Sequence, residues 1–470
     1  MKTVSPAATI RARHMLAALL ALVVSSAAFG AASRKNVLFL FSDDLRVELG
    51  CYGTPGIRTP NIDTLAARSV RFERAYAQYP LCNPSRSSLL TGRYPTVTGV
   101  LDNRQWWGHD HPDWKSLPRF FKDHGYASLR TGKIFHGGID DTDAWTEGGE
   151  KRDFTGPRRD NAPGQVPGNS DRIVVLEGDG EEHGDYRVAT RAIDYLTRYK
   201  GGKQPFFLAC GFSKPHSPPT APKKMFDLYD PAKVPLPRDF APRPTVPAGF
   251  PKFSVPARNS DLFIGRDASE EEARLVKRAY WASVSFMDAQ VGRVLTALDR
   301  LGLRENTVIV FWGDHGYHLG EKGKWSKHYS LLEVGTRVPL LISAPGVAGN
   351  SQPCPRIVET LDLYPTLADL CGLPVPAGLN GVSLAPLLRH PNANWDRPAY
   401  SVTVIQDKLG RAVRTDKWRY AEWDESREGA VLFDCAKDPD ELTNLAADPK
   451  FAATVKEMRG LLARLPGRTR

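Results

Sequence analysis

Cysteine is scarce in this chain, with six in 470 residues. Small proteins held together by disulfides are far richer in cysteine, so that class is excluded. Long apolar runs are also missing after the first thirty or so residues, and no segment there resembles a membrane span. The length and a hydrophobic content of 41% instead predict a globular protein with a substantial core and two domains.

The N-terminus has the pattern of a secretory signal peptide, which we assign to residues 1–32. Basic residues precede an apolar run at 15–24, and small residues follow it. This run is too short to span a bilayer comfortably, and no cysteine lies at the cleavage region. We therefore expect an exported protein, periplasmic or secreted, with neither membrane insertion nor a lipid anchor after cleavage.

Acidic residues are outnumbered by basic ones, which gives a formal net charge of +10 and a pI near 9.2. In an exported protein this balance favours an acidic polysaccharide over a nucleic acid as the partner. A generally basic secreted protein would show the same balance, so charge alone does not select a substrate.

Alternating strand and helix patterns predict an α/β fold. Apolar runs at 37–41, 205–209, 307–312 and 338–343 are expected to be buried strands. The clearest helix covers 269–301, where Ser269 and Glu272 form a capping box. This alternation predicts a sandwich with a largely parallel sheet, and sites in such sheets assemble at the carboxyl ends of the strands.

The pattern changes near residue 391. We predict an α/β domain over 33–391 and a small subdomain over 392–470, an antiparallel sheet with a helix. Its expected strands are at 400–404, 410–414, 417–421 and 430–433, and its helix at 448–465. Two stretches rich in glycine or proline, 137–182 and 215–256, are expected to be long surface loops.

Two pairs of polar residues directly follow predicted strands. Asp43 and Asp44 follow the first strand, and Asp314 and His315 follow the strand at 307–312. Adjacent carboxylates repel unless a cation lies between them, and oxygen ligands favour Ca²⁺ or Mg²⁺. Capping of the next helix explains the first pair equally well on its own. The same arrangement in a distant part of the chain favours a metal site.

Cys82 begins the sequence Cys-Asn-Pro-Ser-Arg, which predicts a short helix with Asn83 as its cap and Pro84 as its first residue. The positive end of the helix dipole would then face Cys82, where it stabilises a bound sulfate, a bound phosphate or a thiolate. Taken alone, the pattern is compatible with a reactive thiolate or with a buried structural thiol.

Basic and imidazole side chains follow other predicted strands. Lys133 and His136 end one of them, His216 follows the strand at 205–209, and Lys327 lies one loop after Asp314. A sulfate group needs positive charge around its oxygens as the bond to the leaving oxygen lengthens, and a histidine can protonate that oxygen. Each of these residues read alone is explained as well by a solvated lysine or a loop histidine.

Together the motifs resemble those of the type I, formylglycine-dependent sulfatases. The sequence beginning at Cys82 and its continuation Leu-Leu-Thr-Gly-Arg match the family motif. His315 beside Asp314, and the string Gly-Lys-Ile-Phe-His ending at His136, are similar to iduronate-2-sulfatase-like members, whereas arylsulfatases tend toward Asn and Gly-Lys-Trp-His. The resemblance implies the fold of alkaline phosphatase and a sulfuric ester hydrolase acting on a sulfated carbohydrate, with 2-O-sulfated uronate suggested by the subfamily.

The resemblance also implies a modified residue and one calcium ion. A formylglycine-generating or anaerobic sulfatase-maturing enzyme would oxidise Cys82 to formylglycine, whose hydrate attacks sulfur and later expels sulfate. The implied calcium ligands are Asp43, Asp44, the residue derived from Cys82, Asp314 and His315. The implied catalytic residues are Cys82, Arg86, Lys133, His136, His216 and Lys327, with His216 as acid and His136 as base.

Two other functions remain compatible with the sequence. A phosphate or phosphonate monoester hydrolase of the same superfamily would use the same metal site, and its product would be phosphate or a phosphonate rather than sulfate. A non-catalytic binder of sulfated glycans would keep Cys82 as a thiol.

Overall fold

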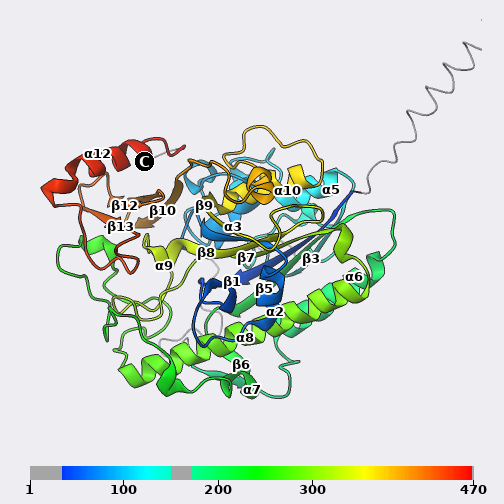
Figure 1. Cartoon of the computed structure of the whole chain (residues 1–470), viewed down its shortest axis with the longest axis horizontal. Helices are drawn as coiled ribbons and strands as arrows, with labels where there is room; N and C mark the ends of the chain where they lie inside the picture. The colour runs from blue at the N-terminus through cyan, green and yellow to red at the C-terminus, as the bar shows by residue number, and fades with distance from the viewer. Residues whose placement is uncertain (1–33, 150–171, 468–470) are drawn as a thin grey trace, which may run out of the picture.

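A seven-stranded sheet forms the centre of the protein (Figure 1). The computed structural model describes residues 34–149 and 172–467, so the predicted signal peptide lies outside the described residues. The strand order is β3-β5-β1-β7-β8-β2-β9, and β8 alone runs antiparallel to its neighbours. The strands are β1 (Asn36–Asp43), β2 (Val70–Tyr76), β3 (Ala127–Gly132), β5 (Phe206–Pro215), β7 (Thr307–Gly313), β8 (Arg337–Ser343) and β9 (Pro353–Glu359). The predicted α/β class and the four predicted buried strands are confirmed.

Helices cover both faces of this sheet. Alternate side chains of β1 enter different cores, Leu38 and Leu40 on one face and Phe39 and Phe41 on the other, because successive side chains of a strand point to opposite sides. One face carries α2 (Pro60–Ala66), α6 (Gly184–Tyr199), α7 (Lys223–Phe226) and α8 (Glu270–Arg300). The other carries α3 (Cys82–Thr91), α5 (Leu117–Asp123), α10 (Leu363–Leu370) and α11 (Ala385–Arg389).

The longest described helix is α8, which runs along one face of the sheet in Figure 1. Its N-terminus carries the predicted capping box, since the Ser269 side chain accepts from the Glu272 N–H and the Glu272 carboxylate accepts from the Ser269 N–H. The buried side of α8 also reaches the end of β1, where the Tyr280 hydroxyl donates to the Asp44 carbonyl over 2.7 Å. The helix therefore supports the chain at the point where β1 ends.

A four-stranded antiparallel sheet with one helix follows the large sheet, as predicted. It consists of β10 (Ala399–Ile405), β11 (Lys408–Arg414), β12 (Trp418–Trp423) and β13 (Ala430–Asp434), in that order, with α12 (Ala452–Leu462). The other α-helices of the described residues are the short α4 (Pro95–Thr98) and α9 (Glu333–Thr336). The 3-10 turns are Gly50–Tyr52, Trp107–His109, Thr142–Ala144, Pro231–Lys233, Lys252–Ser254, Arg304–Asn306, Thr360–Asp362 and Pro449–Phe451.

The two stretches predicted as long loops contain some regular structure. Strand β4 (Val174–Leu176) lies in the first and pairs in parallel with β6 (Thr220–Pro222) in the second. The many prolines of the second stretch predict a loop there. Strand β6 has only three residues, and a strand this short forms among the prolines. Part of the first stretch, 150–171, lies outside the described residues.

All six cysteines are described and none forms a disulfide. No helix in the ranges 34–149 and 172–467 is both long enough and apolar enough to cross a membrane.

A buried acid joins the end of β9 to the C-terminal sheet. Glu359, 2% exposed, accepts from the Tyr94 hydroxyl over 2.6 Å and from the Tyr400 N–H of β10 over 2.8 Å. Burial, and after it the neighbouring Asp362 carboxylate, raise the pKa of Glu359 to about 8. The folded protein therefore holds this proton at pH values where the unfolded chain has lost it.

The pH dependence of stability should reveal this acid. Because the folded state binds the extra proton, the contribution of Glu359 is complete below its ordinary pKa of 4.5 and is lost as the pH rises through about 8. Urea unfolding of Glu359→Gln should show a flatter decline between about pH 5 and about pH 8.5 than that of the parent protein. The matched control is Glu457→Gln on the exposed side of α12. An equally steep decline in both variants would contradict the assignment.

Candidate active site

Three carboxylates meet where β1 and β7 end. Asp43 is the last residue of β1, and Asp44 follows it with a left-handed φ of 60°, a strained conformation for a residue other than glycine. Asp314 follows β7, and its Oδ1 accepts from the Asp44 N–H over 3.1 Å. All three side chains are fully buried. The ends of β1 and β7 thus place three carboxylates close together at one edge of the sheet.

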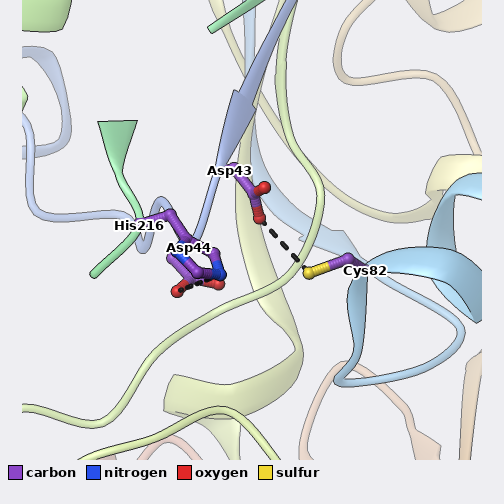
Figure 2. Close-up of side chains that lie close together, drawn as sticks. All are labelled: Asp43, Asp44, Cys82 and His216. Atoms are coloured by element: carbon purple, nitrogen blue, oxygen red, sulfur yellow. Dashed lines mark hydrogen bonds and ion pairs between the residues drawn. The ribbon is translucent and has the colours of Figure 1, made fainter. Parts of the chain in front are cut away.

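Cys82 lies against this group (Figure 2). It is the first residue of α3, and its Sγ is 3.4 Å from Asp43 Oδ1 and 3.4 Å from His315 Nε2. The sulfur is buried, with the residue only 1% exposed. Residues that are 39 and 233 positions away from Cys82 in the chain therefore surround one atom.

His315 presents one ring nitrogen to the group. Its Nδ1 lies 3.0 Å from the Gly316 carbonyl, so Nδ1 carries the proton and donates to that oxygen. Nε2 faces Cys82 Sγ and lies 3.5 Å from Asp44 Oδ1 and 3.6 Å from Asp314 Oδ1. Histidines that bind metals commonly donate their second nitrogen to the backbone in this way.

Three cationic side chains balance the carboxylates. Lys133 forms an ion pair with Asp43, and Lys327 Nζ is 2.8 Å from Asp44 Oδ2. Arg86, one helical turn after Cys82, places its Nε 2.9 Å from Asp314 Oδ2. Burial would raise the pKa of Asp43, but the Lys133 ammonium and the other cations around it hold that pKa well below its usual range. Asp43 is therefore charged, whereas burial and then the Asp43 charge raise the pKa of Asp314 above its usual value.

The two predicted catalytic histidines lie beside these cations. His216 is half-buried, with Nε2 3.9 Å from Asp44 Oδ2 and Nδ1 donating to the Ser217 carbonyl over 2.7 Å. His136 has a buried Nδ1 without a hydrogen-bond partner among the described residues. Burial, and then the Lys133 charge, lower the pKa of His136 to about 2, which keeps its ring neutral. A pKa this low makes the ring a weak base, so a role for His136 as proton acceptor rests on the position of its unpaired Nδ1.

The arrangement fits a divalent cation with oxygen ligands. Asp43, Asp44, Cys82 and His216 offer ligand atoms within 4.8 Å of one another, and so do Asp43, Cys82, Asp314 and His315. In the part of the chain that the structure describes, the buried Asp44 Oδ1 has no hydrogen-bond partner, so it is available to a metal. Carboxylate oxygens suit a hard ion such as Ca²⁺, and the thiol of Cys82 is the one soft group in the set.

Two sequence predictions about Cys82 are wrong. The helix begins at Cys82 with Leu81 as its N-cap, and Asn83 is not the cap because its side chain donates to the carbonyls of Asp102 and Gln105. A thiolate is not favoured either. Burial, and then the adjacent Asp43 carboxylate, raise the pKa of Cys82 well above its ordinary value.

Sequence reasoning missed Asp261. This buried carboxylate accepts from the Tyr317 hydroxyl over 2.6 Å and from the Ser217 hydroxyl, and lies 3.6 Å from Lys327 Nζ. Lys327 is thus held between Asp44 and Asp261, and this cation keeps the pKa of Asp261 at about 2 although burial would raise it. Asp261 follows no predicted strand and belongs to no motif, so the sequence carries no signal for it.

Comparison with known proteins identifies the family. The family model described as Sulfatase matches residues 35–373, and a second, described as N-sulphoglucosamine sulphohydrolase, C-terminal, matches residues 320–467. The chain belongs to the sulfatase family. Its predicted membership, its alkaline-phosphatase-like fold and its activity as a sulfuric ester hydrolase are confirmed.

Several relatives of this sulfatase cover most of its length. It is 36% identical to mouse iduronate 2-sulfatase over 411 residues, which are 76% of this chain and 72% of the relative. It is 35% identical to a sulfatase of Formosa agariphila over 451 residues, 91% of this chain and 86% of that one. A solved structure described as a 2-O GAG sulfatase is 26% identical, with a TM-score of 0.67 and coverage of 92% of this chain and 91% of that one.

Proposed function

We propose that this sulfatase removes sulfate from a sulfated glycan and that its target is a 2-O-sulfated uronate. The observation that carries the proposal is the position of Cys82 against three buried carboxylates, with Lys133 and Lys327 beside them. The similarity to iduronate 2-sulfatases and to a 2-O GAG sulfatase supports the choice of sugar and of sulfate position. The excess of basic residues suits an acidic polysaccharide.

The proposal includes formylglycine at position 82 and one Ca²⁺. Asp43, Asp44, Asp314 and His315 would hold the ion, and an oxygen derived from Cys82 would replace the soft sulfur and complete a set suited to calcium. When bound, the ion supplies positive charge to the sulfate oxygens, and the modified residue supplies a hydroxyl nucleophile.

The protein's own cations bind and orient the sulfate group. Lys133 and Lys327 are fixed by Asp43 and Asp44, so their ammonium groups are positioned before substrate arrives. Arg86 is fully buried and contacts Asp314 through Nε, and its Nη1 donates to the carbonyls of Lys133 and Ile134. Its Nη2 lies 3.8 Å from Asp43 Oδ2 and has no hydrogen-bond partner among the described residues. Arg86 therefore ties α3 to the end of β3 and keeps residue 82 in place.

The two histidines move protons at opposite stages. His216 donates its Nδ1 proton to the Ser217 carbonyl, which leaves Nε2 to carry a second proton beside Asp44 and release it to the departing sugar oxygen. The buried Nδ1 of His136 is unpaired among the described residues, and this position suits acceptance of a proton when sulfate is expelled.

Localisation and partners follow from the same proposal. The N-terminal pattern supports export to a periplasm or the outside, with no membrane insertion after cleavage. A formylglycine-generating or anaerobic sulfatase-maturing enzyme is the partner that position 82 requires. We propose no nucleic-acid partner.

A panel of sulfated sugars tests the substrate. We expect kcat/KM for sulfate release from a disaccharide with a 2-O-sulfated uronate to exceed that for 4-O- and 6-O-sulfated hexosamines by about a hundredfold or more. A site that binds one sulfate position leaves its buried polar groups unpaired when the sulfate is at another position of the sugar. Ion chromatography measures the product. Equal rates across the panel contradict the uronate assignment, and faster release of phosphate from a phosphate monoester contradicts the choice of ester.

A further inference from the structure

The C-terminal sheet carries a pocket of about 420 Å³ that no part of the proposed mechanism uses. It lies between the start of β12, the end of β13 and the beginning of α12, and none of its lining residues belongs to the site around Cys82. Its volume falls within the range of ordinary small-ligand sites.

Two aromatic rings form an apolar wall of this pocket. The rings of Trp418 and Phe451 meet edge to face, with centroids 5.8 Å apart. Both residues are only partly buried. The Lys417 ammonium lies 4.6 Å from the centre of the Trp418 ring. This cation–π contact keeps the Lys417 charge beside the pocket.

Three lysines surround the aromatic wall. Lys417, Lys437 and Lys450 all line the pocket and all are exposed, Lys417 with 57% of its side chain accessible. Lys417 lies 3.8 Å from Asp434, a weak contact. Among residues 34–149 and 172–467, the ammonium groups of Lys437 and Lys450 form no ion pair. Their charge is available to a ligand.

The two acidic residues of the pocket are already engaged by the backbone. Asp434 accepts from the N–H groups of Ala436 and Lys437, each over 3.3 Å. Asp438 accepts from those of Leu442 and Thr443 over 2.8 to 3.0 Å. These hydrogen bonds hold the two carboxylates against the backbone, and three lysines beside two aspartates leave the lining with an excess of positive charge.

We propose that this pocket binds an anionic saccharide unit of a sulfated glycan, away from the residue being desulfated. The aromatic wall packs against the apolar face of a sugar ring, the lysines pair with its sulfate or carboxylate groups, and the hydroxyls of Thr443 and Thr454 suit its polar edge. The choice of a sulfated glycan rests on the proposed function. A second binding point on the same chain raises affinity for long substrates and leaves short ones unaffected.

Binding of heparin, a sulfated polysaccharide, tests the proposal independently of turnover. In a Cys82→Ala background, the triple variant Lys417→Gln, Lys437→Gln and Lys450→Gln should bind heparin about tenfold more weakly in calorimetry at moderate salt. The matched control replaces Lys200, Lys203 and Lys233 by Gln. It removes the same charge from exposed positions outside the pocket.

The outcomes separate the pocket from general electrostatics. Equal weakening in both triple variants overturns the proposal, as does unchanged affinity in the pocket variant. With Cys82 intact, the pocket variant should retain its kcat/KM on a sulfated disaccharide within about twofold and should show a kcat/KM about tenfold lower on heparin chains. If no variant releases sulfate but the affinity difference persists, the proposed function fails and the pocket stands. A change of oligomeric state in the pocket variant would assign this surface to a second copy of the chain and also overturn the proposal.

Discussion

Replacing Cys82 by serine should lower kcat for sulfate release by about 10⁴-fold or more, because enzymes that lose their nucleophile lose effects of this size. The fold should survive, since serine is slightly smaller than cysteine and the buried position keeps its neighbours. The measurement is sulfate release from a 2-O-sulfated uronate disaccharide, alongside thermal unfolding of both proteins. Cys435→Ser, which changes a half-buried cysteine in the C-terminal sheet, is the matched control and should remain active.

Mass spectrometry of the same proteins tests whether the loss of activity comes from the loss of formylglycine at position 82. Tryptic cleavage yields a peptide of residues 75–86 that contains Cys82. Active protein should show this peptide with loss of H₂S and gain of one oxygen, and Cys82→Ser should show an unmodified serine. Active protein with an unmodified cysteine, or an active serine variant with an unmodified serine, contradicts the mechanism. An active serine variant whose serine is oxidised to the same aldehyde would show that maturation does not require the thiol. An unmodified cysteine in inactive protein would instead fit a glycan binder.

Replacing Lys327 by methionine should have the second largest effect. Lys327 is 3% exposed and pairs with Asp44 and Asp261, so the variant leaves two buried carboxylates without their cation. Loss of one partner from a buried ion pair costs about 3 kcal/mol or more of folding free energy, and loss of one donor to the reacting group costs about 10²-fold or more in kcat. Urea unfolding without added metal and steady-state kinetics measure the two effects.

A double variant separates stability from activity. Asp44→Asn combined with Lys327→Met removes both charges of the Lys327–Asp44 ion pair. The double variant should therefore recover much of the unfolding free energy that Lys327→Met loses. Activity should stay as low as in the single variant, because neither the cation for sulfate nor the carboxylate is restored. Recovery of activity in the double variant would show that Lys327 only compensates Asp44 and does not contact substrate.

Much of the fold follows from continuous apolar runs. The segments at 37–41 and 307–312 are fully buried strands because helices cover both faces of the sheet, and such strands carry no polar alternation. The capping box of Ser269 and Glu272 predicts the residue at which α8 begins. The direction of β8 was not predictable, because an apolar run does not state whether its strand runs parallel or antiparallel.

The site was predictable where short motifs follow strands and not elsewhere. Asp43, Asp44, Asp314 and His315 come together because parallel strands end at one edge. Asp261 was missed because it reaches Lys327 from a segment with no strand or motif around it. The protonation of Cys82 was misjudged because the sequence shows the helix start but not the burial and the neighbouring Asp43 that raise its pKa.

The central place of β1 in the sheet has a consequence for the order of folding. Val37 pairs with Phe207 on one side and with Val308 on the other, so this early strand lacks both neighbours until some 170 and 271 further residues exist. Contacts of such long sequence separation form late. Cys82, which ends up buried against β1 and His315, should remain accessible on the growing chain until β7 emerges. The proposed maturing enzyme would therefore meet this cysteine before β7 joins the sheet, and folding would then close the site over the modified residue.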